Sequence, residues 1–196
     1  NDTANRLVQD VMNLFCDKWG KQSMPEFSRE VNYILRNYTN NPDPYKREKK
    51  ESNDLVLGLV PELNEIIRKS SDPFRTALRL SIAGNIIDFA TGDGFDLQTT
   101  INMVLNSDFA IDHSLKLKME IEKADKVLYI GDNAGEIVFD KIFISTINHP
   151  HLTFVVRGGP VINDATMEDA LYIGMNKIAK VISSGYDIPS VILEKS

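Results

Sequence analysis

Hydrophobic residues recur at intervals of three and four through most of residues 1–121, and this spacing predicts amphipathic helices. Clusters of Pro, Gly, Asn and Asp separate these periodic segments, as expected for turns between helices. Thr3 is expected to cap the first helix. The later helices are expected at residues 26–38, 45–70, 73–89, 97–105 and 114–121. The N-terminal part of the chain is therefore predicted to be helical.

From residue 122 the pattern changes, because short runs of β-branched and aromatic residues alternate with helical segments. Strands are expected at residues 126–130, 152–157 and 180–183, with helices at about 136–147 and 167–173. The order β-α-β-α-β predicts an α/β fold with a parallel sheet and right-handed crossovers. We therefore divide the chain into a helical domain, residues 1–121, and an α/β metal-binding core, residues 122–196.

Three strands make a small parallel sheet, and parallel sheets are normally covered on both faces. We therefore expect either that the helical domain covers the sheet or that further strands follow Ser196. The chain begins at Asn1 and not at Met, which also fits a partial chain.

Acidic and amide side chains follow the first two predicted strands. Asp132 and Asn133 lie in the segment 131–136 directly after the first strand, and Asn163 and Asp164 come after the second. Because the carboxyl ends of parallel strands meet at one edge of a sheet, these side chains are expected to lie together. Each pair alone is typical of a turn or a helix cap. Two such pairs at one edge favour a ligand site.

Two carboxylates and one or two amide oxygens form a hard donor set, which favours magnesium or manganese and tolerates cobalt or nickel. Such a cation could polarise a phosphoryl oxygen and activate water, or Asp132 could itself attack phosphorus. Phosphate oxygens could be bound by Arg157, by the Gly158–Gly159 backbone, and by the N–H groups of the helix that starts near Glu136.

A stripe of small and polar residues lies on the predicted helix 73–89, whose other positions are mostly apolar. Its members share one helix face: Ser81, Gly84, Asn85 and Asp88. These residues are poor helix formers for a solvent face. The stripe is therefore either a cavity wall or a buried hydrogen-bond network, and the sequence favours neither.

The start of the predicted helix 45–70 is strongly basic. Helical spacing places Lys46 and Lys50 on one stripe with Asp43 and Asn53. Such a stripe is either a solvated face or a surface that faces a phosphate.

Composition excludes several classes of protein. A net charge of −6 and a pI of about 5.1 disfavour a nucleic-acid partner. No apolar run approaches the length of a membrane span, so no membrane partner is expected. The single cysteine, Cys16, cannot form an internal disulfide, which fits a reducing cytoplasm.

Several of these motifs occur together in one known family. The chain resembles the damage-control phosphatases, formerly labelled domain of unknown function eighty-nine, and is most similar to their stand-alone archaeal branch. The resemblance covers roughly residues 40–185. It rests on Gly-Asp-Asn-Ala-Gly-Glu at 131–136, Arg-Gly-Gly-Pro-Val-Ile-Asn-Asp-Ala-Thr at 157–166, Gly-Asn-Ile-Ile-Asp at 84–88, and Asp-Pro-Tyr-Lys at 43–46 with Lys49 and Asn53. The joint presence of these motifs is fairly specific.

The resemblance implies a helical N-terminal part packed on a Rossmann-like α/β/α core. It also implies a divalent-metal phosphatase for phosphorylated sugars or related small metabolites. By motif, Asp132, Asn133 and Asp164 match the family's metal ligands, and Asn85 and Asp88 match residues of its substrate pocket. The family's Cys-x-x-Cys segment does not occur in this chain. Its Lys-Gly-Gln-Gly-Asn-like loop, whose lysine meets the phosphate, is also absent.

The leading hypothesis is therefore a metal-dependent phosphomonoester hydrolase with Asp132 and Asp164 as catalytic residues. Its partner would be a small phosphorylated metabolite, and a homo-oligomer is compatible with the sequence. The expected substrate-binding residues are Asn85, Asp88, Arg157, Gly158, Lys46, Lys49 and Glu136. One alternative is an S-adenosylmethionine-dependent methyltransferase whose acidic loop holds the cofactor ribose. Another is a non-catalytic module that binds a metal or a metabolite.

Overall fold

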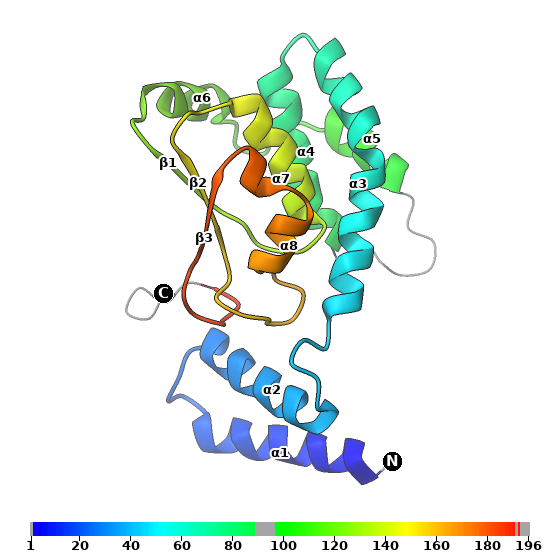
Figure 1. Cartoon of the computed structure of the whole chain (residues 1–196), viewed down its shortest axis with the longest axis vertical. Coiled ribbons are helices and arrows are strands. Elements are labelled where there is room, and N and C mark those ends of the chain that lie inside the picture. Colours follow the sequence, from blue (N-terminus) through cyan, green and yellow to red (C-terminus); the bar gives the residue numbers. More distant parts are fainter. Residues whose placement is uncertain (1, 89–96, 191, 193–196) are drawn as a thin grey trace.

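The computed structural model of the chain describes residues 2–88, 97–190 and 192. Helices make up its first part, and a three-stranded parallel sheet with intervening helices makes up the second (Figure 1). The helices before the sheet are α1 (Asp2–Lys18), α2 (Met24–Thr39), α3 (Lys46–Lys69), α4 (Pro73–Asp88), α5 (Leu97–Asn106) and α6 (Ser114–Lys123). The predicted α/β class is confirmed, and the end of α4 that was predicted at Phe89 lies outside the described residues.

The sheet has the order β1-β2-β3, and all its pairings are parallel. Its elements are β1 (Val127–Ile130), α7 (Glu136–Ile147), β2 (Leu152–Val156), α8 (Met167–Tyr172), a 3-10 turn at Met175–Lys177, and β3 (Lys180–Ser183). The register places Tyr129 opposite Phe154, and both rings point toward the buried face. On the other face Leu128 and Ile130 remain 63% and 53% exposed.

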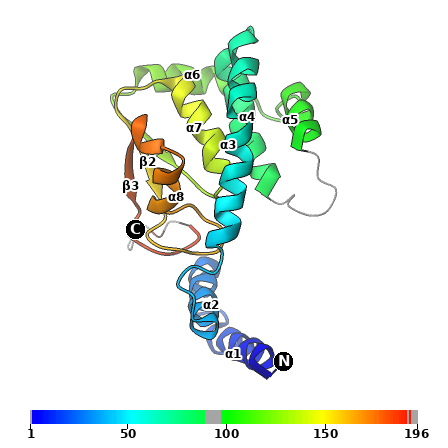
Figure 2. The same ribbon diagram turned by 45° about the vertical axis from the view of Figure 1, so that its right-hand side comes forward.

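The buried core lies between the sheet and the long helices. Figure 2 shows α7 and α8 between the strands and α3, so that α7 has the sheet on one side and the N-terminal helices on the other. The side chains of Leu80, Ile137 and Phe139 are fully buried in this layer. One cluster of buried side chains therefore includes residues from both the predicted helical domain, residues 1–121, and the predicted α/β core, residues 122–196.

Close packing of α4 on α7 depends on a glycine in the helix interface. A Cβ atom at Gly84 would lie 3.1 Å from the side chain of Glu136 and 3.3 Å from the ring of Phe139. Glycine costs helix stability, and here it allows the two helix backbones to approach. This approach brings the polar stripe of α4 against the first turns of α7.

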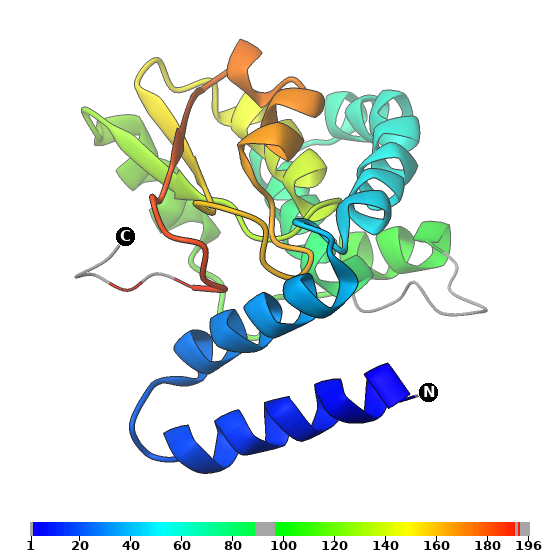
Figure 3. The ribbon, with the colours of Figure 1, turned by 60° about the horizontal axis from the view of Figure 1, so that its bottom comes forward.

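Helices α1 and α2 form an antiparallel pair below the rest of the chain (Figure 3). The pair is tied to the α/β part through α2, where Asn32 donates to the carbonyl of Pro160 at 2.9 Å and Arg29 donates to Asp187 at 2.8 Å. These bonds fix the loop after β2 and the segment after β3. None of the helices in the described ranges is long and apolar enough to span a bilayer.

Candidate metal and phosphate site at the strand ends

The first candidate loop begins where β1 ends at the sheet edge. The N–H of Gly131 still donates to the carbonyl of Val155 at 2.9 Å, so the backbone leaves the sheet only after this residue. A Cβ atom at Gly131 would lie 2.3 Å from the ring of Phe154. Glycine is therefore required for the chain to turn over this buried ring and present the next two residues, Asp132 and Asn133.

Backbone hydrogen bonds join this loop to the loop after β2. The N–H of Ala165 donates to the carbonyl of Asp132 at 2.7 Å, and the N–H of Ala134 donates to the carbonyl of Asn163 at 2.9 Å. Asn133 and Asp164 also form an isolated antiparallel bridge. The two acidic strand ends therefore lie side by side, as expected for neighbouring parallel strands.

Arg157 lies between the two carboxylates. Its Nε donates to Oδ2 of Asp164 and its Nη2 donates to Oδ1 of Asp132, both at 2.5 Å. The side chains of Arg157 and Asp164 are 8% and 7% exposed, whereas that of Asp132 is 46% exposed. The site is therefore closed toward Asp164 and open toward Asp132.

The sequence predicts Arg157 at this site, but it does not predict which groups the guanidinium contacts. Arg157 was expected to face a phosphate, yet it binds the two predicted metal ligands. The position of an arginine at the end of the middle strand, between two acid-bearing loops, was the available signal.

Asn133 is positioned by the first turn of α7 and by α4. Its backbone N–H lies 3.5 Å from Oε2 of the buried Glu136, and the Nδ2 of Asn85 donates to Oε1 of the same carboxylate at 3.0 Å. The predicted residues Asn85 and Glu136 therefore lie beside the acidic loop. Asp88 ends α4, but its side chain lies outside the described part of the structure.

The inner half of the α4 stripe is a buried hydrogen-bond network. Ser81 and Tyr129 donate to Oδ1 of Asp140 at 2.7 and 2.6 Å. Burial raises the pKa of Asp140 to about 6, although both hydroxyl donors favour its charged form. Burial also raises the pKa of Tyr129, with the nearby Asp140 carboxylate as a further cause. Asp140 is not among the site residues predicted from the sequence. The available signal was a single acidic residue in an apolar stretch, one helical turn after Glu136.

Lys46 and Lys49 lie in a different cluster. Lys49 is 2% exposed, and its Nζ lies 2.8 Å from Asp43 and 3.1 Å from Asp169, while the exposed Lys46 pairs with Glu168 at 2.7 Å. These side chains line a cavity of about 250 Å³ whose lining includes neither Asp132 nor Asp164. Both lysines therefore pair with acids other than Asp132 and Asp164.

Asn53 connects this cavity to the acidic loop. Its fully buried side chain accepts a hydrogen bond from the N–H of Gly135 at 2.7 Å, and its Nδ2 has no partner among the described residues. Gly135 has a φ of +84°, which favours glycine, and it precedes the first residue of α7. Through Asn53, helix α3 therefore holds the loop in place at Gly135.

The N–H of Gly158 is already engaged, because it donates to the carbonyl of Tyr186 at 3.0 Å. A Cβ atom at Gly158 would lie 2.3 Å from the backbone nitrogen of Tyr186, so glycine is required by the close passage of this segment. A phosphate oxygen at this amide would have to displace the Tyr186 carbonyl.

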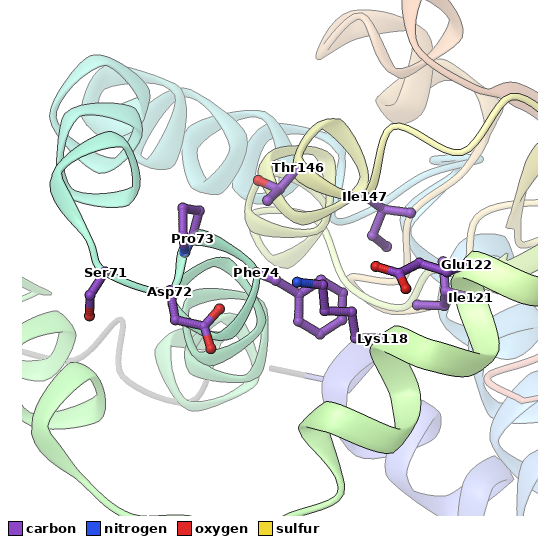
Figure 4. A pocket seen from close by; sticks show the side chains of 9 residues that line it. All are labelled: Ser71, Asp72, Pro73, Phe74, Lys118, Ile121, Glu122, Thr146 and Ile147. Carbon is purple, nitrogen blue, oxygen red and sulfur yellow. The ribbon is translucent and has the colours of Figure 1, made fainter.

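A further cavity, of about 440 Å³, lies between the start of α4, α6 and the end of α7 (Figure 4). Phe74, Lys118 and Ile147 are among the side chains that line it. Ile147 is the last residue of α7, about 17 Å along the helix from Glu136. This cavity is therefore remote from the strand ends that carry the acidic motifs.

The donor chemistry at the strand ends suits a divalent cation. Asp132, Asn133 and Asp164 offer two carboxylates and an amide oxygen, which are the ligands of hard cations. No group of three His, Cys, Asp or Glu side chains in the described ranges has the arrangement of a metal site. A cation at this edge would therefore depend on the asparagine, on water or on a substrate oxygen.

Comparisons with known proteins agree on one family. Residues 2–196 match the profile of the damage-control phosphatase ARMT1-like domain. The chain is 36% identical to an uncharacterized protein from Methanocaldococcus jannaschii, over 97% of this chain and 65% of that protein. It is 32% identical to a damage-control phosphatase from Pyrococcus horikoshii, over 98% of this chain and 68% of that protein.

A solved structure gives the same result. The crystal structure of a DUF89 family protein from Pyrococcus horikoshii superposes with a TM-score of 0.86 at 31% identity, and the match covers 99% of this chain and 69% of that one. The chain thus spans about two thirds of the length of these relatives.

Proposed function

Because the chain belongs to the damage-control phosphatase ARMT1-like family, we propose that it carries the catalytic core of a divalent-metal-dependent phosphatase. Its substrates are phosphomonoesters of sugars or related small metabolites. Two of the relatives bear the name damage-control phosphatase, which supports this reaction class. Magnesium, manganese, cobalt and nickel are the candidate metals, and a reducing cytoplasm is the expected setting.

The observation that carries the proposal is the joining of the two acidic loops. The hydrogen bonds from Ala165 to Asp132 and from Ala134 to Asn163 bring two carboxylates to one edge of the sheet. In the proposal Asp132, Asn133 and Asp164 hold the metal. When bound, the metal would withdraw charge from the phosphoryl group and lower the pKa of a water molecule.

The remaining residues of the site orient these ligands and the substrate. Glu136 accepts from Asn85 and approaches the backbone N–H of Asn133, so it links α4 to the loop that carries the proposed ligands. Asn85 is exposed, so its side chain can also meet the non-phosphate part of a substrate. The guanidinium of Arg157 lies against the acidic pair, and it carries the positive charge that a bound phosphate would need.

The test is phosphate release from a panel of phosphorylated metabolites that includes fructose 1-phosphate, with manganese and with a chelator. The wild type is expected to release phosphate only with metal, and Asp132→Ala is expected to lose this activity. Asp125→Ala is the matched control, because Asp125 is exposed and lies before β1, at the opposite end of the strand. Full activity of Asp132→Ala would refute the assignment of the site.

A further inference from the structure

We infer that Arg157 occupies the place of a divalent cation between Asp132 and Asp164, and that cation binding displaces its outer nitrogen from Asp132. The inference rests on the proposed function, since it assumes that these carboxylates bind a metal. It adds a competition within the site that neither the motifs nor the comparisons contain.

The contacts show why one guanidinium can take this place. Each carboxylate gives one oxygen to Arg157 at 2.5 Å, so a single positive group joins two negative ones. A cation that uses Oδ1 of Asp132 needs the lone pairs that Nη2 now contacts. Two positive groups at the same oxygens also repel each other, and the repulsion is strong where water is scarce.

Burial determines which of the two contacts can open. The contact with Asp164 is enclosed, since both side chains are under 10% exposed, whereas the contact with Asp132 lies at the exposed edge. The backbone of Arg157 is also fixed, because its N–H donates to the carbonyl of Ala165 at 3.0 Å. Arg157 can therefore keep its Nε bond to Asp164 while Nη2 moves.

The geometry of the loops does not depend on this guanidinium. The backbone bonds from Ala165 to Asp132 and from Ala134 to Asn163 join the loops independently of the Arg157 side chain. Removal of the guanidinium would therefore remove a competitor and leave the two carboxylates in place. The affinity for the cation is therefore expected to rise in such a variant.

After the exchange, the freed Nη2 would lie beside the bound cation. An anionic phosphate oxygen is the ligand that both positive groups would share. Metal binding would in this way convert Arg157 from a partner of the carboxylates into a partner of the substrate. Arg157 would then contact the acids in the metal-free site and bind phosphate in the metal-bound site, which is the role expected from the sequence.

Calorimetric titration of chelator-treated protein with manganese tests the competition. We expect Arg157→Met to bind manganese at least threefold more tightly than the wild type, and to have the lower melting temperature without metal. Arg47→Met is the control, because Arg47 is an exposed arginine with pairs to Glu48 and Glu51 and should change neither value. Equal or weaker manganese binding by Arg157→Met would overturn the inference.

A second measurement uses the wild type and does not require the variant to fold. The guanidinium N–H signals of Arg157, assigned through its own side-chain carbons in NMR spectra, should shift when magnesium is added. Unchanged signals at saturating magnesium would contradict the displacement. If the wild type binds no divalent cation, both the proposed function and the inference are overturned. If the wild type binds the cation and Arg157→Met binds it with the same affinity, only the inference is refuted.

Discussion

Two clusters in this protein have the same composition, because each places one basic side chain between two aspartates. Arg157 lies between Asp132 and Asp164 at the strand ends, and Lys49 lies between Asp43 and Asp169 where α3 meets α8. The Arg157 contacts are both 2.5 Å, and the Lys49 contacts are 2.8 and 3.1 Å. The two clusters differ in exposure and in what else their carboxylates bind.

The carboxylates around Lys49 have other structural tasks. Asp169 accepts hydrogen bonds from the backbone and the hydroxyl of Thr166 at 2.9 and 2.7 Å, which caps α8. Asp43 also accepts from the N–H of Tyr45. With Lys49 fully enclosed, neither acid can change partner without the loss of local structure.

The strand-end cluster is less constrained on one side. The Asp132 carboxylate contacts Arg157 and, at 3.5 Å, the Nδ2 of Asn133, and nearly half of its side chain surface is exposed. A half-exposed carboxylate with one strong partner can exchange that partner for a ligand. Exposure and other bonds, more than the presence of an ion pair, therefore distinguish a ligand site from a structural cluster.

The largest expected effect on activity comes from Asp132→Asn, which should reduce metal-dependent phosphate release at least 100-fold, about 2.7 kcal/mol of transition-state stabilisation. The free energy of unfolding in a chelator should change by less than about 1 kcal/mol, because Asp132 is nearly half exposed and Arg157 keeps its ion pair with Asp164. Phosphate assays and urea unfolding would test this. Asp125→Asn serves as the control, and a large loss of stability with retained activity would reverse the proposed contrast.

Lys49→Met should have the opposite profile. It leaves two carboxylates buried without their cation, and we expect it to lower the free energy of unfolding by about 3–5 kcal/mol. Urea unfolding measures this loss. Lys116→Met, at an exposed position, should be nearly neutral. A Lys49→Met protein with wild-type stability would show that this cluster is not structural.

Asp140 is a further buried acid, and the contacts described for it are with hydroxyl groups. Its raised pKa means that folding binds a proton between about pH 4 and pH 6, so its contribution to stability is present at low pH and is lost as the pH rises through about 6. Relative to Asp140→Asn, the wild type should lose roughly 2–3 kcal/mol between pH 4 and pH 7.

Urea unfolding at several pH values measures the Asp140 effect, and the difference between the two proteins cancels the titration of other groups. Parallel pH profiles of wild type and variant would show that Asp140 titrates normally. A basic side chain beside Asp140 would instead lower its pKa, and stability would then rise with pH. The sign of the pH dependence therefore separates Asp140 from the acids of the other two clusters, which have a basic partner.

The smallest expected effect comes from Thr166→Ala. The change removes the hydroxyl that caps α8 and donates to Asp169, and it should cost about 1 kcal/mol of stability. Manganese affinity should stay unchanged, since Asp169 belongs to the structural cluster. Thr166→Ser should retain most of the stability, and a change in manganese binding in Thr166→Ala would connect the two clusters.

The sequence was sufficient to place the acidic strand ends, and the partners of the basic residues required the structure. The runs before Gly131 and after Leu152 identify two parallel strands, so the proximity of Asp132 and Asp164 follows from a local pattern and a general rule. The contacts of the Arg157 side chain with both acids depend on three-dimensional side-chain positions, which the sequence pattern does not give.

The burial of Lys49 could not be predicted for a similar reason. Its partner Asp169 lies 120 residues away, and the stripe at the start of α3 has the pattern of a solvated face. Of the two alternatives predicted for the small-residue stripe of α4, the buried hydrogen-bond network is confirmed, and the cavity wall stays a prediction. Ser81 is part of a buried network, and Asn85 lies at the exposed end beside the acidic loop.

The most direct test of the account is the position of manganese in crystals, located by anomalous scattering. We predict a single strong peak about 2 Å from carboxylate oxygens of both Asp132 and Asp164, with Nη2 of Arg157 moved away from Asp132. A manganese peak at other residues, or none at saturating concentration with the Arg157 contacts intact, would contradict the account.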